Sequence, residues 1–177
     1  MKSPIGSRPA LTSVTLEDGL VAYRCPQSGG HYIPAAAYMR WLSKQPARTE
    51  HLPPKDDAEV LEESDKVYLC PETDTIMTRY KVGHGFRFTI DRSITGGVWL
   101  DAGEWEALKS RNFHDEIHFI FTDPWQKKIA RAGLSSAMLQ RLEQHLGPEL
   151  FQKITALKEG LAEHPHRAEA HAYLTRE

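Results

Sequence analysis

The sequence is poor in cysteine, has no excess of either charge and contains no long apolar run. Its two cysteines, Cys25 and Cys70, are too few for a disulfide framework, so we expect two free thiols. The 22 basic and 24 acidic side chains nearly cancel, which argues against a nucleic-acid-binding protein. No segment has the apolar length of a membrane span, and the first residues lack an apolar signal core. We therefore expect a cytoplasmic protein with no membrane partner.

Two stretches of the 177 residues resemble each other in the order of their features. "CPQSGGHYIPAAAYMRWLS" (25–43) aligns with "RSITGGVWLDAGEWEALKS" (92–110), so that the Gly-Gly pairs coincide and Tyr32 falls on Trp99. Upstream, residues 3–20 align with residues 70–86 after a one-residue slip. The sequence therefore predicts an internal repeat.

Each repeat is expected to contain a β-hairpin followed by a short helix. "TSVTLEDGLVAYR" and "TRYKVGHGFRFTID" both alternate about a turn that contains glycine. In the second repeat, Asp101 is the expected N-cap, and Glu104 is placed to reach back to it as in a capping box. Leu100 and Trp105 have the spacing of a hydrophobic staple. We therefore expect Trp99 and Trp105 to be core residues rather than a ligand platform.

Beyond residue 110 the pattern is helical. One helix is expected in "TDPWQKKIARAG", ended by Gly133, and another in "LSSAMLQRLEQHLG". A further helix, "PELFQKITALKEGLAEHP", places Leu150, Ile154, Leu157 and Leu161 on one face.

The string "GGVWLDAGE" (96–104) carries a resemblance to the bacterial TFIIB-type zinc-ribbon family. Members pair a CPxC knuckle with a CPxCGG knuckle that continues as GxWLDxGE. Residues 70–109 give the closest match, and residues 3–43 resemble a more decayed copy. The signature residues are Gly96, Gly97, Trp99, Leu100, Asp101, Glu104 and the following Trp105.

The resemblance implies an α+β fold of two zinc-ribbon-like β-hairpin units, each followed by a short helix, with a C-terminal helical region added. The expected segments are a first repeat at 1–46, an acidic linker at 47–66, a second repeat with its helix at 67–121, and the helical region at 122–177.

The resemblance also assigns four zinc-ligand positions to each repeat. They are Cys70, Thr73, Arg92 and Thr95 in the second repeat, and Ser3, Gly6, Cys25 and Ser28 in the first. A structural zinc requires four thiolate or imidazole ligands, and Arg92 places a permanent cation in the metal's position. We therefore expect neither ribbon to bind zinc, no cofactor, and an ion pair between Arg92 and an acid such as Glu72 or Asp74.

The string "FHDEIHFIF" (113–121) is the most enzyme-like part of the sequence. His114 and His118 have the i, i+4 spacing of a weak metal site on a helix, although no third ligand follows at a known spacing. An amphipathic helix with a buried apolar face explains the same pattern.

Because catalytic motifs, basic patches and metal ligands are missing, the expected function is a non-catalytic protein-interaction or scaffold module. The alternatives are a metal-dependent hydrolase that uses His114 and His118, or a nucleic-acid-binding ribbon, which the near-neutral charge disfavours. We expect the partner to be an unidentified protein, or a second copy of the chain bound through the C-terminal helices.

Overall fold

The computed structural model describes residues 1–46, 50–53 and 66–175, so most of the linker expected at 47–66 lies outside the described residues. The chain divides into two compact units, Met1–Ile129 and Ala130–Glu177. The helix α4 (Asp123–Leu146) runs through the division. Within the described ranges, no helix has both the length and the hydropathy that crossing a membrane requires.

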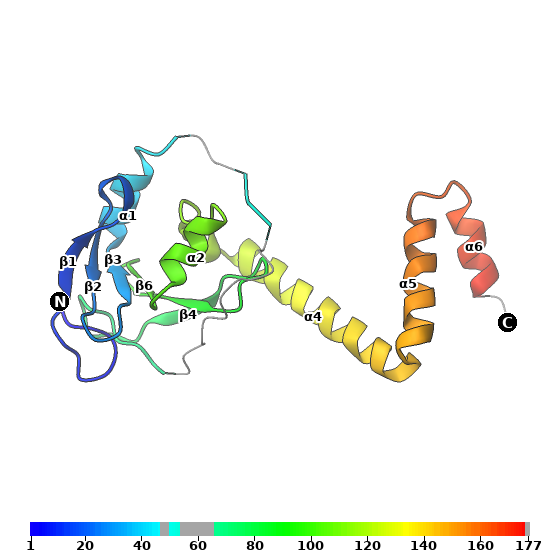
Figure 1. The fold of residues 1–177 in the computed structure, drawn as a ribbon, viewed down its shortest axis with the longest axis horizontal. Coiled ribbons are helices and arrows are strands. Elements are labelled where there is room, and N and C mark those ends of the chain that lie inside the picture. The colour runs from blue at the N-terminus through cyan, green and yellow to red at the C-terminus, as the bar shows by residue number, and fades with distance from the viewer. Residues whose placement is uncertain (47–49, 54–65, 176–177) are drawn as a thin grey trace. The chain divides into compact units, whose positions relative to one another are not determined.

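An antiparallel sheet of six described strands forms the centre of the first unit, in the order β1-β2-β3-β6-β5-β4 (Figure 1). The first half of the unit contributes β1 (Thr12–Thr15), β2 (Val21–Arg24) and β3 (His31–Ile33). The second half contributes β4 (Thr78–Lys81), β5 (Thr89–Arg92) and β6 (Val98–Leu100). The expected hairpins are confirmed as β1–β2 and β4–β5, and the fold class is α+β.

The two halves have the same order of strands and following helix, apart from a short 3-10 helix (Glu17–Gly19) between β1 and β2, and they meet at the centre of the sheet. A short helix follows the third strand of each half: α1 (Ala35–Leu42) follows β3, and α2 (Glu104–Ser110) follows β6. The strands β3 and β6 pair antiparallel, with Tyr32 opposite Trp99. Because these two residues hold the same position in the aligned sequences, the pairing relates the halves by a local two-fold axis. The two repeats therefore share one sheet.

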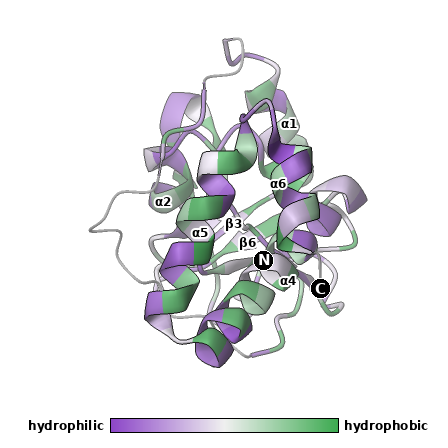
Figure 2. Ribbon diagram, turned by 90° about the vertical axis from the view of Figure 1, so that its right-hand side faces the viewer, coloured by the Kyte–Doolittle hydropathy of each residue, from purple (hydrophilic) through white to green (hydrophobic). Residues whose placement is uncertain are grey.

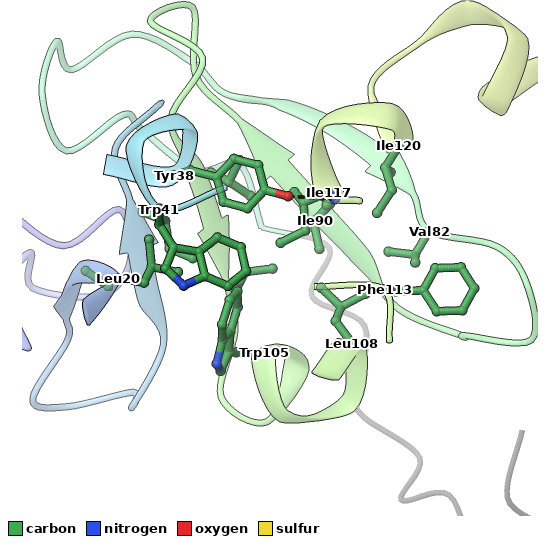
Figure 3. Packing of buried hydrophobic residues seen from close by; sticks show 14 of the residues in the cluster. Leu20, Tyr38, Trp41, Val82, Ile90, Trp105, Leu108, Phe113, Ile117 and Ile120 are labelled. Carbon is green, nitrogen blue, oxygen red and sulfur yellow. Dashed lines mark hydrogen bonds between the residues drawn. The ribbon is translucent and has the colours of Figure 1, made fainter. Parts of the chain in front are cut away.

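The core on one face of the sheet is covered by α1 and α2. Alternate residues of a strand point to opposite faces, so Ile33 and Leu100 lie on this face, away from Tyr32 and Trp99. Trp41 of α1 and Trp105 of α2 meet edge to face here, with ring centroids 6.2 Å apart (Figure 3). Trp105 has an exposed fraction of 2%, as expected of a core residue.

Tyr38 of α1 fixes the segment after α2 to the same core. Its hydroxyl donates to the carbonyl of His114 and accepts from the backbone N–H of Ile117, both at 3.1 Å (Figure 3). The short helix α3 (Ile117–Ile120) begins at this point, and Ile117 and Ile120 are buried in the core.

The start of α2 differs from the expected one. The helix begins at Glu104, and the residue before it, Gly103, has a left-handed conformation with φ of 87°. Asp101 is therefore not the N-cap: its carboxylate instead accepts hydrogen bonds from the Trp99 indole and the Tyr68 hydroxyl. Glu104 does reach back as expected and accepts the backbone N–H of Asp101 at 2.7 Å.

The second unit contains the remainder of α4, together with α5 (Pro148–Ala162) and α6 (Arg167–Leu174). Gly133 does not end a helix, contrary to expectation: α4 continues from Asp123 to Leu146. A single glycine costs a helix only about 1 kcal/mol relative to alanine, which a helix of this length tolerates. The break comes at Gly147, which has φ of 74° and precedes Pro148.

Candidate functional site

The turns that contain Ser3 and Cys70 are each closed by a backbone hydrogen bond, and the turn at Ser3 is one residue longer. In the first half the N–H of Ser3 bonds to the carbonyl of Pro9, and in the second the N–H of Cys70 bonds to the carbonyl of Thr75. An isolated β-bridge flanks each turn. Ser3 and Cys70 therefore hold equivalent positions, as the aligned sequences place them.

The second knuckle turns differ by one residue. In the first half the N–H of Cys25 bonds to the carbonyl of Gly30, whereas in the second half the N–H of Ser93 bonds to the carbonyl of Gly97. The second turn is therefore one residue tighter. By its backbone hydrogen bonds, Ser93 rather than Arg92 is the counterpart of Cys25, which corrects the expected ligand position.

Arg92 was also expected to form an ion pair with Glu72 or Asp74, but neither pair occurs among the residues that the structure describes. The Arg92 guanidinium lies over the ring of Phe121, 5.1 Å from its centroid. Asp74 pairs with Arg8 from the first half, and this pairing lowers the pKa of Asp74. Glu72 accepts hydrogen bonds from the hydroxyls of Tyr32 and Thr95, at 3.0 and 2.6 Å.

Polar side chains of the second half surround a tyrosine from the first half. The Tyr32 hydroxyl is 3.7 Å from the Cys70 sulfur and 3.3 Å from the Ser93 hydroxyl. Ser93 in turn is 2.8 Å from the Thr95 hydroxyl. Burial raises the pKa of Tyr32, so the phenol stays neutral at physiological pH. A neutral phenol therefore fills the space between these side chains.

The corresponding side chain on the other side of the two-fold axis is Trp99. It is 1% exposed and lies in one buried cluster with Cys25 of the first half. Its indole N–H donates to Asp101 at 2.8 Å. Each half thus inserts one aromatic ring, Tyr32 or Trp99, toward the knuckles of the other half.

This exchange of rings gives the two Gly-Gly pairs a physical reason. A Cβ added to Gly30 would lie 2.5 Å from the Trp99 ring, and one added to Gly97 would lie 2.0 Å from the Tyr32 oxygen. The preceding glycines, Gly29 and Gly96, have φ of 76° and 84°, which side chains rarely adopt. The first glycine of each pair is therefore needed for its positive φ, and the second is needed because a side chain there would clash with the aromatic ring of the other half.

The donors at these positions do not fit a structural zinc ion. Each half supplies one thiol, and its other donors are hydroxyls, which are poor zinc ligands. Among the residues that the structure describes, no three histidine, cysteine or acidic side chains are grouped so that they could hold a metal ion.

Both thiols still accept the backbone N–H bonds of a knuckle turn. The Cys25 sulfur accepts from Ser28 and the Cys70 sulfur from Glu72, both at 3.4 Å. Burial raises the pKa of both thiols, but hydrogen bonds, chiefly from Ser28 and Thr73, outweigh it and make the net shift downward.

His114 and His118 do not share a helix face, so that expectation is wrong. His114 precedes α3 and only His118 lies within it. The centroid of the His114 ring lies 5.8 Å from the ring centroids of both Trp41 and Trp105. Burial lowers the pKa of His114. The i, i+4 argument for a metal site therefore no longer holds.

Two acids near these elements, Glu104 and Glu116, are buried, which the sequence does not indicate. Burial, reinforced by the Asp101 charge, raises the pKa of Glu104 to about 9. Glu116 is 1% exposed and lies 2.9 Å from the imidazole of His51, which stacks on the Phe113 ring. This pair anchors the described segment 50–53. Glu104 belongs to the GGVWLDAGE signature and Glu116 to no motif, and in both cases only the fold reveals that the acid is buried.

The helices of the second unit leave apolar side chains in solvent. No residue of α4, α5 or α6 is buried, and Leu134 and Met138 of α4 are 73% and 74% exposed. Figure 2 shows α5 with apolar and polar residues alternating in bands along its length. The α5 stripe consists of Leu150, Ile154, Leu157 and Leu161, as the sequence predicts.

No family model, no curated protein and no solved structure matches this chain. Its function is therefore inferred from the chemistry and the placement of its own side chains.

Proposed function

We propose that the chain is a non-catalytic protein-interaction module, built from two TFIIB-type zinc-ribbon-like units that hold together without zinc. In this proposal the exchanged rings of Tyr32 and Trp99 replace the metal as the centre of each knuckle pair. A structural zinc contributes on the order of 10 kcal/mol to the folding of a small ribbon. Burying one aromatic side chain contributes at most about 4–6 kcal/mol, so the two rings together can stabilise the fold by about as much as one structural zinc.

The observation that carries the interaction function is the exposed apolar surface of the C-terminal helices. Large apolar side chains on α4 and α5 are between 39% and 74% exposed; they are Leu134, Met138, Leu139, Leu142, Leu150, Ile154 and Leu157. Large exposed apolar patches on proteins mark sites where another macromolecule binds. An amphipathic helix with such a face is a common element of protein recognition.

The competing functions have less support. A hydrolase that uses His114 and His118 depended on their sharing a helix, and they do not. A nucleic-acid-binding ribbon needs an excess of positive charge, whereas the chain has a formal net charge of −2.

The proposal can be tested by incorporating a photo-cross-linking amino acid at a single position of the protein and expressing that variant in the native host. Met138 on α4 is the test position, and Ile94 in the Ser93–Gly97 turn is the control, since the two side chains are 74% and 81% exposed. We expect Met138 to give a discrete protein adduct and Ile94 to give none. The absence of an adduct from Met138, or equal adducts from both positions, would contradict the proposal.

A further inference from the structure

The apolar residues of the α5 stripe have the same spacing in both directions along the helix. Leu150, Ile154, Leu157 and Leu161 are spaced four, three and four residues apart, which is the a/d spacing of a helix that packs against another helix. Leu150, Ile154 and Leu157 are 48%, 41% and 47% exposed, so the stripe is half open to solvent. A stripe with symmetric spacing can pack against its own copy.

Within the described residues, the second unit covers this stripe only in part. None of the described residues of α4, α5 and α6 is buried. A helix of 15 residues such as α5 is marginal in water unless its apolar face packs against something. The stripe therefore needs a partner that is present whenever the chain is present, and a second copy meets that condition.

The charge of the second unit favours a copy of itself over an oppositely charged partner. Residues 130–175 carry five basic and five acidic side chains: Arg131, Arg141, Lys153, Lys158 and Arg167 against Glu143, Glu149, Glu159, Glu163 and Glu169. Nucleic acids and anionic membranes bind surfaces with a positive excess, which this balance lacks. Two neutral units approach each other without like-charge repulsion.

We infer that two copies of the chain associate through α5, with the two helices antiparallel about a two-fold axis. This inference rests on the proposed function and names its partner. The axis passes between Ile154 and Leu157, so that Ile154 lies opposite Leu157 of the partner subunit. At the ends of the stripe, Leu150 lies opposite Leu161 of the partner subunit.

The charged neighbours of the stripe fit this arrangement. Lys153 and Lys158 lie on opposite sides of the stripe, because they are separated by five residues at 100° per residue. In an antiparallel helix pair, the Lys153 side of one stripe faces the Lys153 side of the other, and the two Lys158 sides face each other in the same way. Lys153 then lies beside Gly160 of the partner subunit and Lys158 beside Phe151 of the partner subunit. The two lysines therefore avoid each other.

Four side chains are fewer than a standard interface contains, so we expect a dimer with a Kd on the order of micromolar. Sedimentation of the full chain over about 1 µM to 1 mM spans that range. The test variant is Leu157→Lys in the stripe. The matched control is Gln152→Lys, which makes the same addition of charge on the exposed opposite face of α5.

The wild-type chain and Gln152→Lys should both sediment as dimers at high concentration, and Leu157→Lys should remain a monomer throughout. A wild-type monomer across the range, or a Leu157→Lys dimer of wild-type affinity, overturns the inference. Because Leu157→Lys could also unfold α5, a second test is needed that introduces no charge into the stripe.

Engineered cysteines provide that measurement and report the orientation. A chain with Leu150→Cys and Leu161→Cys should form an interchain disulfide on mild oxidation, whereas Leu150→Cys alone should form none. The two positions are too far apart along one helix, about 16 Å, to join within a chain. Cys25 and Cys70 are 0% exposed and do not compete. Equal cross-linking of the single variant would overturn the antiparallel arrangement.

The two proposals fail separately. A monomeric chain whose cross-linker at Met138 captures a different protein would overturn self-association and leave the interaction function in place. A monomeric chain that captures nothing would overturn both.

Discussion

The hydroxyl of Tyr32 lies against Gly97 so closely that a Cβ there would be 2.0 Å from the phenol oxygen. The two residues belong to different halves of the molecule, and the same relationship joins Trp99 to Gly30. Because neither glycine has a positive φ, these contacts alone require glycine at the two positions.

Gly97→Ala should therefore destabilise the protein by about 3 kcal/mol, the upper part of the range for overpacking a buried site. The matched control is Gly19→Ala in the first hairpin turn, where a Cβ meets nothing but φ is 79°. Backbone strain alone should cost that variant about 1 kcal/mol. Urea denaturation measures both, and a smaller loss for Gly97→Ala than for Gly19→Ala would refute the close approach.

Trp105→Ala should reduce the free energy of unfolding by roughly 3–5 kcal/mol, since it removes a large side chain buried between the sheet and the two helices. Ile94→Ala is the control, because Ile94 is 81% exposed and should change stability by less than about 0.5 kcal/mol. Thermal denaturation of both variants provides the comparison. Similar melting temperatures for the two would mean that Trp105 does not hold the core together.

The purified protein should contain well under one zinc ion per chain, because each half offers a single thiol among hydroxyl donors. Elemental analysis measures the zinc content directly. A strong chelator should leave the melting temperature unchanged, because donors of this kind do not hold a zinc ion whose loss would destabilise the fold. Stoichiometric zinc that is lost in Cys70→Ser would show instead that the second knuckle pair still binds metal.

Glu104→Gln should remove part of the protein's pH dependence. Burial, with the Asp101 charge adding to it, raises the pKa of Glu104 from its ordinary 4.5 to about 9. Between these values the folded state holds a proton that the unfolded state has released, so stability falls as pH rises. The slope is at most about 1.4 kcal/mol per pH unit, and the contribution is fully present only below pH 4.5.

Glutamine keeps an acceptor for the Asp101 N–H and does not titrate, so the variant should gain stability relative to the wild type as pH rises. Urea denaturation of both proteins between pH 4.5 and about pH 9 measures the difference. A difference that stays constant across this window would mean that Glu104 titrates normally in the folded protein.

The hairpins and the two short helices could be predicted because their signals are local, whereas the third strands β3 and β6 were not predicted. Alternation about a glycine-containing turn predicts β4–β5, and the spacing of Leu100 and Trp105 places both in the core. Glu104 also reaches back to Asp101 as its spacing implies. The error at Asp101 itself arose because its carboxylate is taken by Tyr68 and Trp99, which a local pattern does not reveal.

The candidate site was harder to predict because its partners are distant in the sequence. The second knuckle turn is one residue tighter than the first, and aligning the Gly-Gly pairs therefore placed Arg92 where Ser93 lies. The entry of Tyr32 into the knuckles of the other half depends on the pairing of β3 with β6, which no motif encodes. The burial of Glu116 beside His51 depends in the same way on tertiary packing.

The exchange of rings also sets an order of events during synthesis. Both turns of the first half are complete in the chain by Gly30, but the ring that packs against Gly30 belongs to Trp99. A nascent chain that ends before β6 therefore lacks one ring of the buried cluster that contains Cys25, and one edge of β3 has no partner strand. Exposure to oxidants and to other unpaired strands should be greatest in this interval and should end once residue 99 has left the ribosome.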